Sequence, residues 1–356
     1  MRKLLVAAFA LALLALIAIL AVDDVETSPR IDGAELLPIA LDGSLQNAAW
    51  SPTGEQIAFT RFRSGYNKPP ADIAILHLAS GSVRFAIKDG ANNVSQPGST
   101  WNARTGSIIF SSDQTGRDEV FTIGADGKAD SLNQLTGIEG HVAFEPSWSP
   151  DGRSFVYEMH RLDEEGNGVI ALATTGSRTI EELTRRGDDC RQPNWSPAGD
   201  IIIYQKKEGN DWDIWVYELG TKTHRRLTDF PGDRTDATFS PDGRWVVYSG
   251  DSPELQDASL FAVPTTGGRP IQVTHAGVYD GAPSWSPDGK FIAFESATPK
   301  SPRFGLSWIS RARNWFREHV DGERETKLWI IKTPDEVRQQ LCVPGSACRG
   351  GRPSTG

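Results

Sequence analysis

Residues 146–152 read Pro-Ser-Trp-Ser-Pro-Asp-Gly, and residues 283–289 repeat the same seven residues. An aromatic residue followed by a short turn recurs at six positions, spaced 51, 47, 47, 44 and 46 residues apart: Trp50, Trp101, Trp148, Trp195, Phe239 and Trp285. Five of the six are followed by Ser-Pro. A period of this length, built from short strands, is typical of a β-propeller. The repeat therefore predicts an all-β protein with six blades.

Each repeat predicts four strands. The residues before the aromatic form the innermost strand, and an almost continuously apolar run such as Phe155–Glu158 follows the turn, as expected of a strand covered on both faces. In the Ser-Pro-Asp-Gly turn, Pro fixes the first corner and Gly takes the positive φ. A Leu-Thr or Val-Thr step predicts the outer strand at Leu135-Thr136, Leu183-Thr184, Leu227-Thr228 and Val273-Thr274.

The last repeat lacks this outer strand, and the missing strand is found near the N-terminus. Leu36–Ala40 precedes Trp50 by about the distance that Leu135 precedes Trp148. We expect this segment to complete blade six and close the ring, because closure removes exposed sheet edges. The repeated Trp residues are expected to fill the spaces between blades.

These motifs resemble the WD40-like propeller repeats of the TolB family. The resemblance rests on the two Pro-Ser-Trp-Ser-Pro-Asp-Gly segments, Asp-Ile-Trp-Val-Tyr at 213–217 and Arg-Leu-Thr at 226–228, and it covers roughly residues 34–334. It implies a propeller that binds a protein partner in the periplasm. The N-terminal α/β domain of TolB is not expected here, because the first strand follows soon after the apolar N-terminus.

The N-terminus predicts export. Arg2 and Lys3 precede an uninterrupted apolar stretch, Leu4–Val22, and Asp23-Asp24 follow it. Nineteen helical residues span about 28 Å, close to the roughly 30 Å hydrocarbon core of a membrane. We expect residues 1–30 to be a signal anchor or a cleaved signal peptide with a short linker. Residues 31–335 would then form the propeller on the periplasmic side, and residues 336–356 a C-terminal extension.

Net charge indicates which partners to expect, and the cysteines indicate a possible disulfide. The net charge of −9 argues against nucleic acid as a partner. Cys342 and Cys348 flank a short Pro-Gly loop, where a disulfide suits an exported protein. We expect a monomer attached to the membrane by its N-terminal anchor.

The candidate site lies just before each repeated aromatic residue, where the chain enters the innermost strand. Polar residues here would converge at one mouth of the axial channel, either as a binding site or as solvated residues that stabilise turns. The candidates are Asn47, Glu145, Asp189, Arg191, Gln192, Arg234, Asp236 and Asp280. This mostly acidic ring could hold a cation or a basic loop of a partner protein.

Blade six carries an insertion at about residues 299–325 that the other repeats lack. Residues 306–319 predict an amphipathic helix, and residues 300–320 carry a charge of +4. The pattern favours contact with an anionic membrane surface, or packing of the helix on the side of the propeller. The residues expected at the membrane are Trp308, Arg311, Arg313, Trp315 and Arg317.

Three functions are compatible with these patterns. The first is a non-catalytic scaffold in the cell envelope that binds a protein partner and needs no cofactor. The second is a metal-dependent propeller enzyme of the lactonase or uronate lyase type, with Ca²⁺ or another divalent ion held by Glu145, Asp236 and Asn47. The third is a glycan-binding module that uses aromatic residues at the mouth, such as Phe144 and Tyr279.

Overall fold

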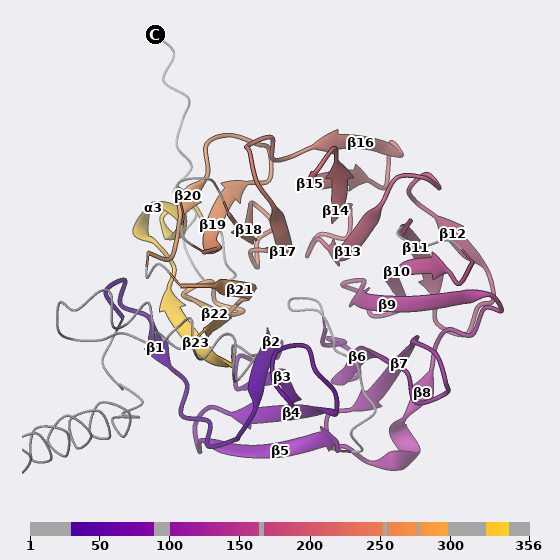
Figure 1. The fold of residues 1–356 in the computed structure, drawn as a ribbon, viewed down its shortest axis with the longest axis horizontal. Helices are drawn as coiled ribbons and strands as arrows, with labels where there is room; N and C mark the ends of the chain where they lie inside the picture. Colours follow the sequence, from indigo (N-terminus) through magenta and orange to yellow (C-terminus); the bar gives the residue numbers. More distant parts are fainter. Residues whose placement is uncertain are drawn as a thin grey trace, which may run out of the picture.

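The computed structural model describes residues 30–88, 100–163, 167–251, 255, 257–275, 278–297 and 325–341. Their strands form six antiparallel sheets arranged around a central axis, as Figure 1 shows. The predicted six-bladed β-propeller is thus confirmed. Within the described ranges, no helix has the length and apolar character needed to cross a membrane.

In blades one to five the strands run outward from the axis in chain order. Blade one contains β2 (Ser44–Trp50), β3 (Gln56–Phe62), β4 (Ala71–His77) and β5 (Ser82–Ile87), and blade two contains β6 (Ser107–Ser112), β7 (Glu119–Gly124) and β8 (Asn133–Gln134). Blade three contains β9 (His141–Trp148), β10 (Ser154–Arg161), β11 (Val169–Thr174) and β12 (Ile180–Glu182). Blade four contains β13 (Cys190–Trp195), β14 (Ile201–Glu208), β15 (Asp211–Glu218) and β16 (Thr223–Arg226). Blade five contains β17 (Arg234–Phe239), β18 (Trp245–Gly250), β19 (Ser259–Pro264) and β20 (Ile271–Gln272).

Blade six combines the two ends of the propeller. It contains β21 (Asp280–Trp285), β22 (Phe291–Ala297), β23 (Thr326–Lys332) and, outermost, β1 (Glu35–Leu36). β1 pairs antiparallel with β23, and Leu37 N continues the contact with a 2.9 Å hydrogen bond to Leu328 O. The predicted closure by an N-terminal strand is confirmed, with pairing that starts one residue earlier than expected.

A buried ion pair reinforces this closure. Arg30 donates hydrogen bonds of 2.7 Å to both carboxylate oxygens of Asp280, and its guanidinium lies over the rings of Phe294 and Trp329. Both charged side chains are almost fully buried. The segment that precedes β1 is therefore fixed to blade six by charge as well as by strand pairing.

The Ser-Pro-Asp-Gly turns have a shared hydrogen-bond pattern. In blade three, Ser149 Oγ donates to Asp151 Oδ1 at 2.7 Å and accepts from Ser154 N at 3.0 Å, while Gly152 has a φ of 64°. The serine hydroxyl thus connects the turn to the start of the next strand. This explains why Ser follows the aromatic residue in five of the six repeats.

The outer strands differ from the prediction. They end just before each Leu-Thr or Val-Thr step, because the threonine hydroxyl takes the place of a backbone acceptor. Thr184 Oγ1 accepts a hydrogen bond from Ile170 N at 2.9 Å, and Thr228 Oγ1 accepts one from Ile214 N at 3.0 Å. The step therefore marks the end of the outer strand and not its centre.

The repeated aromatic residues pack between sheets, as predicted. Trp101, Trp148, Trp195, Phe239 and Trp285 are all buried in the core, and Trp50 is half-buried. In blade two, the described part of the innermost strand is a single bridge between Trp101 and Ile108. The short helix α3 (Asp335–Arg338) follows β23, and its Val337 is fully buried against the core of blades five and six.

Several predicted features lie outside the described residues. They are the N-terminal apolar segment, the predicted membrane-contact residues Trp308, Arg311, Arg313, Trp315 and Arg317, and the proposed disulfide partners Cys342 and Cys348. These remain predictions from the sequence.

Candidate functional site

The innermost strands share a β-bulge three residues before the aromatic residue. In blade one, Gln46 pairs with Thr60 and Ala49 with Ala58, so two residues face one across the ladder. In all five blades described at this position the bulged residue has a positive φ: Asn47 (54°), Glu145 (50°), Gln192 (49°), Asp236 (55°) and Ala282 (45°). Because this conformation is unfavourable for residues other than Gly, its recurrence indicates a constraint imposed at the axis.

The bulge leaves backbone N–H groups unpaired in the ladder, and the preceding blade provides their acceptors. Asn47 N donates to Glu295 Oε2 at 3.0 Å, and Gln192 N donates to Glu158 Oε2 at 3.2 Å. Asp236 N donates to Gln192 Oε1 at 2.9 Å. The polar side chains around the axis therefore connect neighbouring blades and satisfy buried donors.

A second set of polar residues was missed in the sequence. Each repeat has a polar residue ten positions after its aromatic: Thr60, Ser111, Glu158, Gln205, Ser249 and Glu295. In the five blades whose bulge is described, this residue lies on the second strand and pairs with the residue just before the bulge. Glu158 and Glu295 are buried at the axis. Their signal was a polar residue at a fixed position within an otherwise apolar strand.

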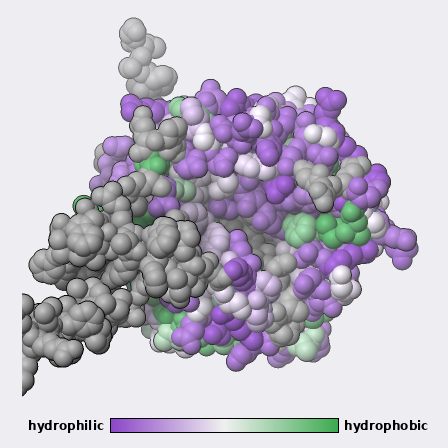
Figure 2. All heavy atoms as spheres, in the orientation of Figure 1, coloured by the Kyte–Doolittle hydropathy of each residue, from purple (hydrophilic) through white to green (hydrophobic). Residues whose placement is uncertain are grey.

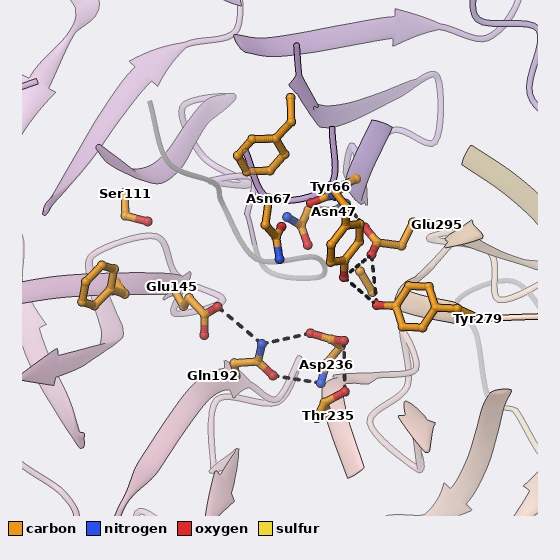
Figure 3. Close-up of a pocket in the computed structure, with 14 residues that line it drawn as sticks. Asn47, Tyr66, Asn67, Ser111, Glu145, Gln192, Thr235, Asp236, Tyr279 and Glu295 are labelled. Atoms are coloured by element: carbon orange, nitrogen blue, oxygen red, sulfur yellow. Dashed lines mark hydrogen bonds between the residues drawn. The ribbon is translucent and has the colours of Figure 1, made fainter. Parts of the chain in front are cut away.

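Some polar residues of both sets, together with four aromatic side chains, line a cavity of about 400 Å³ at the axis. Figure 3 shows side chains from several blades pointing toward one another across the cavity. Figure 2 shows that hydrophilic residues predominate on the face of the propeller seen in that view. The lining residues are Gln46, Asn47, Phe62, Tyr66, Asn67, Ser111, Phe144, Glu145, Gln192, Thr235, Asp236, Tyr279, Ala282 and Glu295. The cavity thus combines carboxyl, amide and aromatic groups.

One side of the cavity is formed by blades three to five. Gln192 Nε2 donates to Asp236 Oδ1 at 2.9 Å and, more weakly, to Glu145 Oε1 at 3.4 Å. Burial, followed by the negative charges of Glu158 and Asp236, raises the pKa of Glu145 well above its usual value. Burial also raises the pKa of Asp236, although hydrogen bonds from Thr235 and Gln192 oppose the effect.

The opposite side is formed by blade six and a loop of blade one. Tyr66, in the loop between β3 and β4, and Tyr279, just before β21, donate to Glu295 Oε1 at 3.2 and 3.1 Å. Their hydroxyl oxygens lie 2.9 Å apart. Burial and the charge of Asp236 raise the pKa of Glu295 to about 8, while burial and Glu295 raise those of both tyrosines.

A histidine lies behind the Glu145 side. His160 Nε2 lies 2.5 Å from Glu158 Oε1, and the His160 ring contacts Phe144 edge-on. Glu158 thus has a partner away from the axis, whereas Glu145 is turned toward the cavity (Figure 3).

The structure brings four of the eight predicted site residues together in the cavity wall: Asn47, Glu145, Gln192 and Asp236. Phe144 and Tyr279, the aromatic residues expected near the mouth, also line it. The position three residues before each aromatic was therefore informative, whereas the remaining candidates came from positions at or just before the start of the innermost strands.

The other four predicted residues do not line the cavity. Asp189 and Arg191 form an ion pair of 3.1 Å beside Trp212. Arg234, the first residue of β17, is buried and donates to the backbone of the preceding loop, with a 2.9 Å bond to Pro231 O. Asp280 is held by Arg30 in the closure described above. Within the described ranges, no group of three or more His, Cys, Asp or Glu side chains is arranged to hold a metal ion.

Comparison with known proteins identifies the family. The model of the TolB beta propeller domain matches residues 20–211 and 141–314, which is most of the chain. This protein belongs to the TolB β-propeller family. A TolB homolog from Chlorobium chlorochromatii is 30% identical over 141 residues, which cover 40% of this chain and 30% of the homolog. The match thus spans less than a third of that relative's length.

Solved structures share the fold. A protein provisionally identified as TolB from Agrobacterium tumefaciens superposes with a TM-score of 0.56 at 17% identity, covering 82% of this chain and 90% of that one. The calcium-binding protein regucalcin from Agrobacterium tumefaciens superposes with a TM-score of 0.54 at 12% identity, covering 86% and 94%. At such low identity, the likeness is one of fold alone.

Proposed function

We propose that this chain is an exported, non-catalytic member of the TolB propeller family that binds a protein partner in the cell envelope. The partner would bind at the mouth of the axial channel. The observation that carries the proposal is the cavity, in which Glu145, Asp236 and Glu295 come from three different blades. A propeller of repeated blades is a rigid support, so side chains that differ from blade to blade are well placed for recognition.

Two further observations support the proposal. Buried carboxyl groups with raised pKa values cluster at functional sites more often than elsewhere in a protein. The positive φ of residues such as Glu145 and Asp236 is a backbone constraint that keeps their side chains at the axis. Export rests on the apolar stretch Leu4–Val22 with positive charge before it and negative charge after it.

Affinity capture tests the proposal. The tagged full chain is compared with a Glu145→Ala/Asp236→Ala variant in solubilised envelopes of the native host. Glu55→Ala is the control, because Glu55 is exposed in the turn after Trp50, at the far end of the blade. We expect one protein to be retained by the wild type and the control and to fall at least about tenfold in the cavity variant, a change of about 1.4 kcal/mol in binding.

The same samples separate folding from binding. Circular dichroism and the melting temperature establish that the cavity variant retains the propeller. Equal capture by all three proteins, or no specific capture by the wild type, contradicts partner binding at this mouth. Protease treatment of spheroplasts tests export independently, because a periplasmic propeller is cleaved without lysis and a cytoplasmic one is not.

A further inference from the structure

One carboxylate oxygen in the cavity has acceptor capacity that the described residues do not use. Glu145 Oε2 is buried and has no hydrogen-bond partner among the described residues. Glu145 Oε1 receives a long 3.4 Å bond from Gln192 Nε2, and the Glu158 carboxyl group lies within hydrogen-bonding reach of the Glu145 carboxyl group. A buried carboxylate oxygen without a donor is costly, so its presence in the wall of a cavity indicates a donor supplied from outside the chain.

The contrast with Glu295 makes this reading specific. Glu295 receives hydrogen bonds from Tyr66, Tyr279 and the backbone N–H of Asn47, so both of its oxygens have donors. The two glutamates lie in the wall of the same cavity, one with its acceptors filled and one without. A ligand donor is therefore expected at Glu145.

The charge of the surroundings defines the ligand further. Glu158 and Asp236 lie close enough to Glu145 for their negative charges to act on it. The described residues that line the cavity include no Lys or Arg. Arg191, outside the lining, is paired with Asp189 but is close enough to interact electrostatically with Glu158 and Glu145. Such a site favours a positively charged group over a neutral one, because a cation beside Glu145 lowers the raised pKa of this carboxyl group and stabilises its ionised form.

The size and walls of the cavity indicate an organic cation. Its volume of about 400 Å³ lies at the small end of the roughly 300–1,000 Å³ typical of sites for organic ligands. Phe62, Phe144, Tyr66 and Tyr279 provide aromatic surface in the same space. Aromatic rings pack against the apolar stems of Lys and Arg side chains and attract their charged ends.

We propose that the cavity receives one lysine or arginine side chain of the partner protein, with Glu145 Oε2 accepting a hydrogen bond from its ammonium or guanidinium group. This inference rests on the proposed function, because the partner supplies the cation. Gln192, held between Glu145 and Asp236, orients the Glu145 carboxylate toward the incoming group. Glu145 is thus the anchor, and the aromatic residues contact the stem.

A titration with model side chains tests the proposal without the partner. Nα-acetyl-lysine methylamide and Nα-acetyl-arginine methylamide are titrated by calorimetry and NMR into the full chain purified in detergent. Nα-acetyl-norleucine methylamide is the neutral control, since it keeps the apolar stem and lacks the charge. We expect saturable binding of at least one cation in the millimolar range, and at least tenfold weaker binding of the norleucine compound.

Matched variants locate the site. Glu145→Gln keeps the shape of the side chain and removes its charge, and it is expected to weaken cation binding at least tenfold. Glu55→Gln, the same substitution at an exposed turn, is expected to leave binding unchanged. The melting temperature of Glu145→Gln shows that the variant is folded. Equal binding of norleucine, unchanged binding by Glu145→Gln, or no saturable binding in the millimolar range overturns the proposal.

Two additional results separate this inference from the proposed function. Binding of the cation without any cavity-dependent partner supports the cation site and contradicts the partner. Capture of a cavity-dependent partner without cation binding contradicts the cation site and leaves the partner. Titration with CaCl₂ in place of the amides tests the metal alternative. If Ca²⁺ binds stoichiometrically and Glu145→Gln abolishes this binding, the ligand of the site is a metal ion and the proposal of an organic cation is overturned.

Discussion

The innermost strand of blade three ends at Trp148, which is buried between sheets and leads into a Ser-Pro turn, whereas Glu145, three residues earlier, lies in a bulge at the axis. The aromatic end is nearly the same in every repeat. In the five blades described at this position, the bulge end carries a different residue each time: Asn47, Glu145, Gln192, Asp236 and Ala282. The aromatic end is shared because every blade must pack in the same way. The variety at the bulge end is what the proposed recognition of a partner at the axis requires.

The largest effect is expected at the aromatic end. Trp195→Ala removes a buried ring from the packing between sheets and leaves a cavity, so we expect a loss of about 3–5 kcal/mol in the free energy of unfolding. Urea denaturation measures this change. A loss below about 1 kcal/mol contradicts the view that the repeated aromatics hold the blades together.

The second effect is the pH dependence of stability that the buried carboxyl groups at the axis should cause. Glu295 has a pKa of about 8 in the folded protein against an ordinary value of 4.5, so the folded state keeps a proton that the unfolded state releases. This group therefore lowers stability as pH rises from about 5 to 8, and the raised pKa values of Glu145 and Asp236 act in the same direction. At about 1.4 kcal/mol per unit of pKa, we expect Glu295 alone to account for a loss of roughly 2–4 kcal/mol in the free energy of unfolding over this range.

Glu295→Gln makes that prediction specific. The glutamine oxygen can still accept hydrogen bonds from the tyrosines but does not titrate, so urea denaturation at pH 5, 6, 7 and 8 should show a shallower decline. Glu55→Gln, an exposed control, should retain the slope of the wild type. Parallel curves for the wild type and Glu295→Gln exclude a buried, titrating Glu295.

The same comparison explains what the sequence could predict. The six blades followed from the aromatic repeat, because each blade solves the same packing problem with the same residues. Asn47, Glu145, Gln192 and Asp236 were found because they hold one position relative to that repeat. Any residue whose position could be counted from the aromatic was in principle accessible.

The misses have equally physical causes. Glu158 and Glu295 sit inside apolar strands, where their polarity was overlooked despite a constant distance of ten residues from the aromatic. Tyr66 reaches the axis on a loop that has no counterpart in the repeat pattern. Asp280 resembled a mouth residue, but its partner Arg30 lies 250 residues away in sequence, a distance over which local patterns carry no information.

A glycine substitution tests the turn at the aromatic end. Gly243 has a φ of 71°, and an added Cβ would meet only Pro197 at 3.6 Å, an ordinary contact. Backbone strain alone should therefore decide the effect of Gly243→Ala, and we expect a loss of about 1–2 kcal/mol in the free energy of unfolding. Unchanged stability in urea denaturation shows that this turn tolerates other backbone conformations.

The smallest effect is expected at the bulge end, where the opposite substitution should be tolerated. Asn47 has a φ of 54°, which Gly adopts freely, and its backbone N–H continues to bind Glu295 whatever the side chain. Within the described residues, the amide side chain of Asn47 has no hydrogen-bond partner. Asn47→Gly should therefore change the free energy of unfolding by less than about 0.5 kcal/mol. A loss above about 1 kcal/mol in urea denaturation shows that the bulge side chain stabilises the fold. Near-neutral stability, together with weaker partner capture, shows instead that the backbone of the bulge maintains the ring and leaves its side chains available for binding.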